Sequence, residues 1–149
     1  MTLSSKLFAG AAGTQMLAPA TLTSTTLSSH IDLQDASDCM IEATIGVQGD
    51  TLSGSIYWEL ELQDSPDDST YTAVVDANIS NPVSDRTATG TFAAIVASAG
   101  CSKVYQVAYR GNQRYVKVNV RATGSHSTGT IIGVTGFGWV NRAQPANVG

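Results

Sequence analysis

"SGSIYWELELQDS", residues 53–65, alternates apolar and polar side chains along most of its length. The apolar side chains are Ile56, Trp58, Leu60 and Leu62, and the residues between them are Tyr57, Glu59, Glu61 and Gln63. Successive side chains of a β-strand point to opposite faces, so this period of two predicts a strand with one buried and one polar face.

The residues that follow predict a turn and a return strand. "DSPDDST" (64–70) collects turn-forming residues around Pro66, and "YTAVVDA" (71–77) leads the chain back. Residues 54–76 are therefore expected to form a β-hairpin with a long acidic loop. Asp64, Asp67 and Asp68 could bind a hard cation there, but the loop lacks the EF-hand spacing and its glycine, so an ordinary acidic turn is favoured.

A second alternating stretch lies in the C-terminal half. Val116, Val118 and Val120 point to one side, and the polar residues between and beside them point to the other. "KVYQVAYR" (103–110) precedes this stretch, and the Gly111-Asn112 pair suits a tight primed turn. A polar loop, "TGSHSTG" (123–129), then leads to "TIIGVTGFGWV". Residues 103–140 are therefore expected to form a three-stranded antiparallel meander.

Shorter signals extend the β pattern over the remaining chain. "CMIEATIGVQGD" (39–50) alternates, residues 92–96 read as a short strand, and residues 21–33 read as a weaker one. No stretch carries a helical period. Seven or eight strands predict an all-β fold, a single antiparallel β-sandwich that is jelly-roll-like. We expect residues 1–22 to form an extended N-terminal arm, residues 23–142 the sandwich, and residues 143–149 a C-terminal tail.

Charge is divided unevenly along the chain. All 12 acidic residues lie between Asp32 and Asp85, whereas seven of the eight basic residues follow from Arg86 onward. Residues 1–85 therefore sum to −11 and residues 86–149 to +7. Because the charges are interspersed with strand-like sequence, we expect acidic and basic strands to pair, within a subunit or across a subunit boundary. Charged residues make up 13% of the chain, about half the usual share of ~25%, which suits burial against partners.

The sequence predicts no catalytic or metal site. Ser125, His126 and Ser127 are adjacent and point apart, so no serine–histidine pair is expected and His126 is interpreted as a solvated loop residue. Glu59 and Glu61 share one strand face, whereas glycosidase carboxylates have contrasting environments across a cleft. We therefore expect a non-enzymatic protein without a cofactor.

The cysteines and histidines also lack the spacing of a metal site. Zinc would require Cys39, Cys101, His30 and His126 to converge without a CxxC or HxxxH motif. The two cysteines permit either one bridge or two buried thiols, and the sequence leaves both open.

Basic residues on the polar side of the C-terminal strands form the candidate interface. They could track a phosphate backbone, but the chain carries a net charge of −4, so a protein partner is favoured over nucleic acid. No stretch approaches the ~18 continuous apolar residues of a membrane span, so no membrane partner is expected. The candidates are Arg110, Arg114, Lys117 and Arg121.

"SGSIYWELELQDSPDDSTYTAV" (53–74) and "VYQVAYRGNQRYVKVNVRATGSHSTGT" (104–130) together resemble small structural proteins of tailed bacteriophages. The shared pattern is a strand ending in Leu-Gln, an acidic turn, a Tyr-Arg-Gly-Asn-x-Arg-Tyr-Val segment and a Thr-Gly loop. It spans residues 54–135 and carries no catalytic signature. The resemblance is strongest to capsid decoration, or cement, proteins.

This resemblance implies a homotrimer on the outer capsid surface, assembled in the host cytoplasm, that binds the major capsid protein across its seams. The N-terminal segment would then act as a clamp. A tail or head–tail connector subunit is the alternative, and a carbohydrate-binding β-sandwich, supported by Trp58, Trp139 and the tyrosines, is a third. The apolar anchors of the clamp are expected to be Leu3, Leu7, Phe8, Met16 and Leu17.

Overall fold

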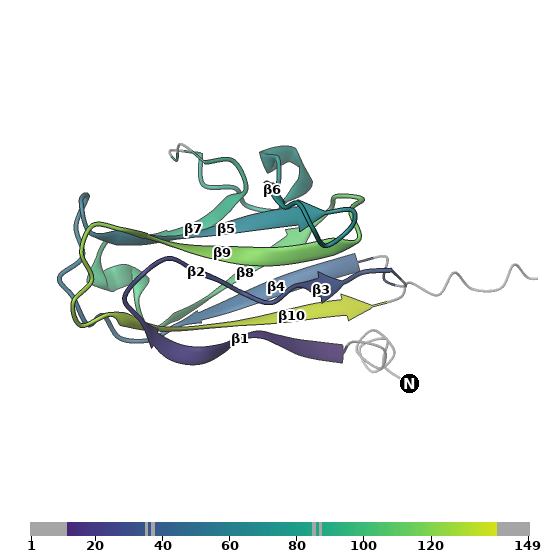
Figure 1. The fold of residues 1–149 in the computed structure, drawn as a ribbon. Helices are drawn as coiled ribbons and strands as arrows, with labels where there is room; N and C mark the ends of the chain where they lie inside the picture. Colours follow the sequence, from purple (N-terminus) through teal and green to yellow (C-terminus); the bar gives the residue numbers. More distant parts are fainter. Residues whose placement is uncertain (1–11, 35, 37, 85, 87, 140–149) are drawn as a thin grey trace, which may run out of the picture.

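The computed structural model describes residues 12–139, apart from positions 35, 37, 85 and 87. Two antiparallel sheets pack face to face (Figure 1), with β5, β7 and β9 in the upper layer and β1, β4 and β10 in the lower. Sheet A has the strand order β1-β10-β4-β8. Its strands are β1 (Ala12–Leu22), β4 (Asp38–Ile45), β8 (Lys103–Tyr109) and β10 (Thr130–Trp139).

Sheet B is built around β5 and β9, which pair with each other. Two short strands, β2 and β3, pair with successive parts of β9, and two others, β6 and β7, pair with β5, so this sheet also has four strand positions. Its strands are β2 (Thr26–Leu27), β3 (Ile31–Asp32), β5 (Tyr57–Ser65), β6 (Thr72–Ala73), β7 (Thr91–Ile95) and β9 (Tyr115–Thr123).

The order of pairing is that of a long hairpin rolled into two layers. β1 pairs with β10, β2 and β3 with β9, β4 with β8, and β5 with β6 and β7. This arrangement is a jelly roll and confirms the predicted fold class. The helical turns of the described residues are the 3-10 turns η1 (Asp76–Asn78) and η2 (Ser98–Gly100), and none of these residues forms a helix able to cross a membrane.

The core lies between the two sheets and follows the alternation of the sequence. Trp58, Leu60 and Leu62 of β5 and the valines of β9 are fully buried and face the inward side chains of β4 and β10. Burying an aliphatic side chain of this kind contributes about 1.5–3 kcal/mol. The predicted hairpin of residues 54–76 is present, with β6 as a two-residue return strand.

The prediction of a meander over residues 103–140 is wrong. β8 belongs to sheet A, β9 to sheet B and β10 again to sheet A, so residues 110–114 cross between the layers instead of making a tight hairpin. Both sheets of a sandwich bury one face. Alternation therefore identifies the buried side of a strand without indicating the sheet to which the strand belongs.

The prediction that residues 1–22 form an arm is wrong for its second half. β1 is an edge strand of sheet A that pairs with β10 from Ala12 opposite Gly138 to Leu22 opposite Thr130, with shifts of register between Gln15 and Leu17 and between Leu17 and Ala20. Met16 is 2% exposed, and a Cβ on Gly136 would lie 2.7 Å from the Met16 sulfur, so this glycine leaves the space that Met16 fills. Residues 1–11 and the predicted tail at 143–149 lie outside the described residues.

Candidate functional site

The acidic residues on the outer face of sheet B are neutralised within the chain. Arg121 of β9 lies opposite Glu59 of β5, with its Nη1 atom 3.7 Å from Glu59 Oε2 and 3.2 Å from Glu61 Oε2. Nε of Arg86 lies 3.8 Å from Glu59 Oε1, and its guanidinium covers the ring of Tyr57. The carboxylate side chains are 3% and 8% exposed. Pairing of acidic and basic segments within one subunit is thus confirmed.

Arg114 pairs with an acidic residue outside the Glu59–Glu61 cluster. Its Nε and Nη2 atoms donate to the two carboxylate oxygens of Asp32 at 2.9 and 2.8 Å, and its guanidinium lies over the ring of Tyr115. The hydrogen bond from Arg114 is the main cause that lowers the pKa of Asp32 to about 2. Both side chains are about 40% exposed, so a pair of this kind contributes little to stability.

Lys117 is also engaged inside the chain. Its Nζ atom lies 3.7 Å from the centroid of the Tyr71 ring, and the Tyr71 hydroxyl donates to Asp68, which also pairs with Nδ1 of His30 at 2.9 Å. Arg110 is exposed and takes part in none of the ion pairs found among the described residues. The four predicted basic residues therefore do not converge on one site.

The acidic residues at the end of β5 and in the turn that follows each have a protein partner. Asp64 accepts a 2.7 Å hydrogen bond from the Tyr109 hydroxyl, and Asp68 is engaged as described above. Asp67 accepts the N–H of Ser69 at 3.0 Å, and hydrogen bonds from Ser69 are the main cause that lowers its pKa to about 2. No group of three or more potential ligands across the described part of the chain is arranged to hold a metal ion.

The interpretation of His126 as a solvated residue is wrong. Its side chain is fully buried, and its ring packs against that of Trp58, with centroids 4.2 Å apart and the planes tilted by 36°. Nε2 lies 3.0 Å from the Thr123 carbonyl oxygen, which can only accept, so this nitrogen carries the proton. Nδ1 faces Asp50 Oδ2 at 3.7 Å. Trp58 lies in the core, so it cannot serve the carbohydrate-binding alternative.

Hydrogen bonds of Asp50 and His126 fix the conformation of the 124–129 loop at the end of the sandwich. The Asp50 carboxylate accepts the N–H groups of Thr128 and Gly129 at 2.9 and 2.7 Å and the Ser127 hydroxyl at 3.1 Å. These bonds lower the pKa of Asp50, with the Thr128 N–H as the largest cause. Because Ser127 donates to Asp50 and His126 Nε2 donates to a carbonyl, the arrangement lacks the serine–histidine contact of a nucleophile.

The cysteines and those predicted apolar anchors that the structure describes lie in or against the core. Cys39 and Cys101 are free and buried, and burial raises the pKa of the Cys39 thiol to about 12. Met16 is in the core and Leu17 packs against it, so the prediction that Met16 is an exposed anchor is wrong. The other three predicted anchors, Leu3, Leu7 and Phe8, lie outside the described residues.

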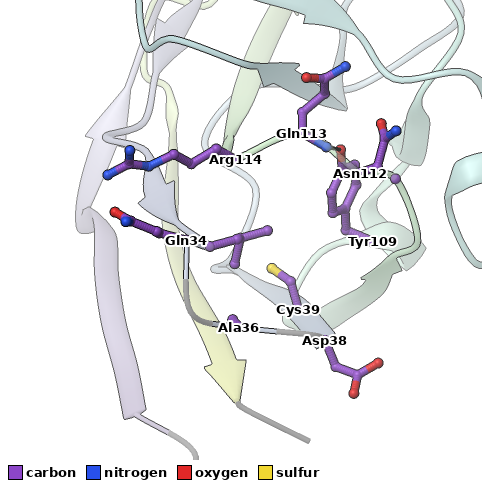
Figure 2. Close-up of a pocket in the computed structure, with 10 residues that line it drawn as sticks. Gln34, Ala36, Asp38, Cys39, Tyr109, Asn112, Gln113 and Arg114 are labelled. Carbon is purple, nitrogen blue, oxygen red and sulfur yellow. Dashed lines mark hydrogen bonds between the residues drawn. The ribbon is translucent and has the colours of Figure 1, made fainter.

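A pocket of about 310 Å³ opens at the end of the sandwich where β4 begins and β8 ends. Figure 2 shows the Cys39 thiol pointing into it, with the charged ends of Arg114 and Asp38 directed to opposite sides. The Tyr109 hydroxyl is already bonded to Asp64 and accepts the Gln113 N–H at 3.1 Å. The pocket therefore brings no reactive pair together.

The outer face of sheet A differs from that of sheet B because it is almost free of charge. β1 and β10 contain no charged residue, while Asp38 and Lys103 are the first residues of their strands. Glu42 is the charged residue in the middle of this surface, and its carboxylate accepts a 2.8 Å hydrogen bond from Gln106. We call the surface the sheet A face; it comprises Gly13, Gln15, Met40, Glu42, Thr44, Val104, Gln106, Ala108, Ile131, Gly133, Thr135 and Phe137.

Outward-facing glycines make the sheet A face flat. A Cβ on Gly13 would lie 3.1 Å from the Phe137 ring, and a Cβ on Gly133 would lie 2.8 Å from the Pro19 ring. Both rings therefore pack flat over the glycine backbone. A side chain at Gly13 or Gly133 would displace the ring from the sheet. This surface was not predicted from the sequence, although residues 130–140 contain no charged residue.

Comparison with known proteins identifies a shared fold. No family model matches the chain, and no curated protein matches it. The chain is similar to the crystal structure of the SPBc2 prophage-derived protein YomS, with a TM-score of 0.52 and 11% sequence identity. The alignment covers 86% of this chain and 91% of that chain. This structural neighbour is a phage-derived protein, and the likeness to it shows that the fold extends over nearly all of both chains.

Proposed function

We propose that this protein is a non-enzymatic structural subunit of a bacteriophage particle. It would decorate the outer surface of the capsid and stabilise it by binding across seams between coat-protein subunits. The observation that carries the proposal is the flat sheet A face, whose strands hold one charged residue, Glu42, away from their ends. A depletion of charge is typical of the buried centre of protein–protein interfaces. The prophage origin of the structural neighbour supports the setting.

The buried and partly buried polar side chains support a structural role because they form hydrogen bonds and ion pairs with other groups of the same chain. His126 and Ser127 are committed to the 124–129 loop, and Glu59 and Glu61 share Arg121. A general acid–base pair needs groups within hydrogen-bond reach of a substrate. The networks described above are instead closed within the chain and support local folding.

We assign the contact with coat protein to residues 1–11, which carry the apolar anchors Leu3, Leu7 and Phe8. The test replaces these three residues with serine and measures co-sedimentation of the variant with coat-protein shells. Binding should be lost while the thermal transition of the isolated protein is unchanged. Alanine at Thr2, Ser4 and Ser5 is the matched control and should bind normally. Full occupancy by the triple-serine variant would overturn this assignment.

The location of the chain in a particle tests the function itself. Particles from the strain that encodes the protein are purified, labelled with a gold-conjugated antibody and imaged by electron microscopy. Label distributed over the head supports capsid decoration. Label confined to the tail or the neck overturns it in favour of a tail or head–tail connector subunit. Particles that contain none of the chain would refute a structural role in the virion.

A further inference from the structure

We propose that the sheet A face binds the same face of a second copy of this chain, with a two-fold axis running along the strands. The inference rests on the proposed structural function, because it names the partner of the surface that carries that function. The register of the strands, the flatness of the surface and its distribution of charge support this pairing.

The register arranges the sheet A face in rows that run across the strands. One row holds Phe137, Met40 and Ala108, and the next holds Thr135, Glu42 and Gln106. A third row contains Thr44 and Val104 beside Gly133, which is buried under the Pro19 ring. Two largely apolar rows thus flank one polar row, and Val104 is 53% exposed. Flat sheets of this kind pack about 10 Å apart with their strands within roughly 30° of each other.

A two-fold axis along the strands brings each row onto the same row of the partner. β10 then lies over the partner's β4, because these two strands are the central pair of sheet A, and β1 lies over the partner's β8. Phe137 faces the partner's Met40, and a thioether against an aromatic ring is favourable. Thr135 faces the partner's Glu42, to which its hydroxyl can donate. An axis across the strands would instead stack Glu42 on the partner's Glu42, with like charges opposed.

The area of the surface is sufficient for a specific contact. The four strands β1, β10, β4 and β8 are 11, 10, 8 and 7 residues long. With strands about 4.8 Å apart and a rise of about 3.3 Å per residue, a face about eight residues long covers roughly 500 Å². Two faces together reach the ~1,000 Å² expected of a specific interface. The homotrimer implied by the phage resemblance would instead use two different surfaces of each subunit, because cyclic trimers have heterologous contacts. Oligomer number therefore separates the two arrangements.

The first test is the mass of the full chain in solution, measured by sedimentation equilibrium. The expected mass is twice the 15.5 kDa of one chain. Thr44→Lys places a charge on the sheet A face and should shift the protein to monomer. Thr72→Lys is the matched control, since this exposed threonine lies on β6 of sheet B, and it should remain dimeric. A wild-type monomer or trimer would overturn the proposal.

The second test is chemical crosslinking, which reports the orientation of the two copies. Gln15 and Gln106 are exposed and lie on the two outer strands of sheet A, about 14 Å apart within one chain at ~4.8 Å per strand. Mixed Gln15→Cys and Gln106→Cys proteins should join through a short bis-maleimide, whereas Gln106→Cys alone should not. The wild-type chain, in which Cys39 and Cys101 are free and buried, is the control and should give no crosslinked product.

The outcomes distinguish this inference from the proposed function. Efficient crosslinking of Gln106→Cys to itself would show a different axis and overturn the arrangement. A monomeric wild-type protein in solution, together with label on the capsid, would refute the self-association alone. A dimer in solution combined with absence from particles would leave the contact in place and refute the virion role.

Discussion

Replacing Arg121 with methionine removes a charge that two buried carboxylates share. Methionine keeps much of the apolar stem, so the change acts mainly on electrostatics. Arg121 Nη1 lies 3.2 Å from Glu61 and 3.7 Å from Glu59, and after the substitution Arg86, at 3.8 Å from Glu59, is the cation that remains. We expect a loss of stability without a change in oligomer mass, because these contacts lie within one subunit.

The size of the loss follows from the geometry. At an effective dielectric constant of ~20, two charges 3.2 Å apart attract by about 5 kcal/mol, and part of this attraction is offset by desolvation. Removing one partner of a buried pair costs about 3–5 kcal/mol. Because the Arg121 side chain is 31% exposed, water can approach the carboxylates after its removal. We therefore expect the free energy of unfolding to fall by about 2–4 kcal/mol, which lowers Tm by roughly 10 °C.

Urea unfolding at neutral pH measures this loss, and an unchanged m-value confirms that the same surface is exposed in each variant. Arg110→Met is the control and should change the free energy of unfolding by less than ~0.5 kcal/mol, because Arg110 is exposed. Glu61→Gln combined with Arg121→Met should recover part of the loss, with a coupling of at least ~1 kcal/mol. Equal effects of Arg121→Met and Arg110→Met would refute the reasoning.

The pKa of Asp32 lies below its ordinary value of 3.8, so the stability that this group contributes is complete above that value and is lost as pH falls toward about 2. Asp32→Asn should flatten the free energy of unfolding over this range, and an unchanged slope would contradict it. Cys39 and Cys101 should react with an aromatic disulfide reagent only after unfolding, and labelling of the native protein would show that they are accessible. By calorimetry, deletion of residues 1–11 should leave Tm unchanged within ~2 °C. Deletion of residues 1–20, which removes most of β1, should lower Tm by at least ~10 °C. Equal Tm values for the two deletions would contradict the place of β1 in sheet A.

Strand identity was predictable because burial follows side-chain parity. The alternation of residues 56–63 placed Trp58, Leu60 and Leu62 on the inner face, and all three are fully buried. The assignment of strands to layers was not predictable, because the pattern is the same in either sheet. β1 was not predicted because its sequence consists mainly of small residues and contains a proline. The burial of Met16 in this strand requires a glycine in another strand, Gly136, which the local sequence does not indicate.

The candidate site shows a similar limit. Lys117 and Arg121 lie on the polar side of β9, as alternation predicted. Their intramolecular partners were not predictable, because Glu61 is 60 residues from Arg121, and Arg114 is 82 residues from Asp32. The burial of His126 was missed for a related reason, since its ring packs against Trp58 of β5, far away in the sequence. Sequence spacing contains little information about such long-range pairs.

The central place of β10 in sheet A has a consequence for synthesis on the ribosome. β10 lies between β1 and β4, yet it is the last of the described strands to be translated. Until it emerges, β1 lacks the strand to which it bonds, β4 lacks one of its two neighbours, and the inward apolar side chains of sheet B face an unfinished sheet A. Long-range pairing of this kind slows folding, and it leaves hydrophobic surface and unpaired strand edges of the nascent chain exposed. A translation arrest before Thr130 should therefore yield an aggregation-prone intermediate that needs chaperone protection.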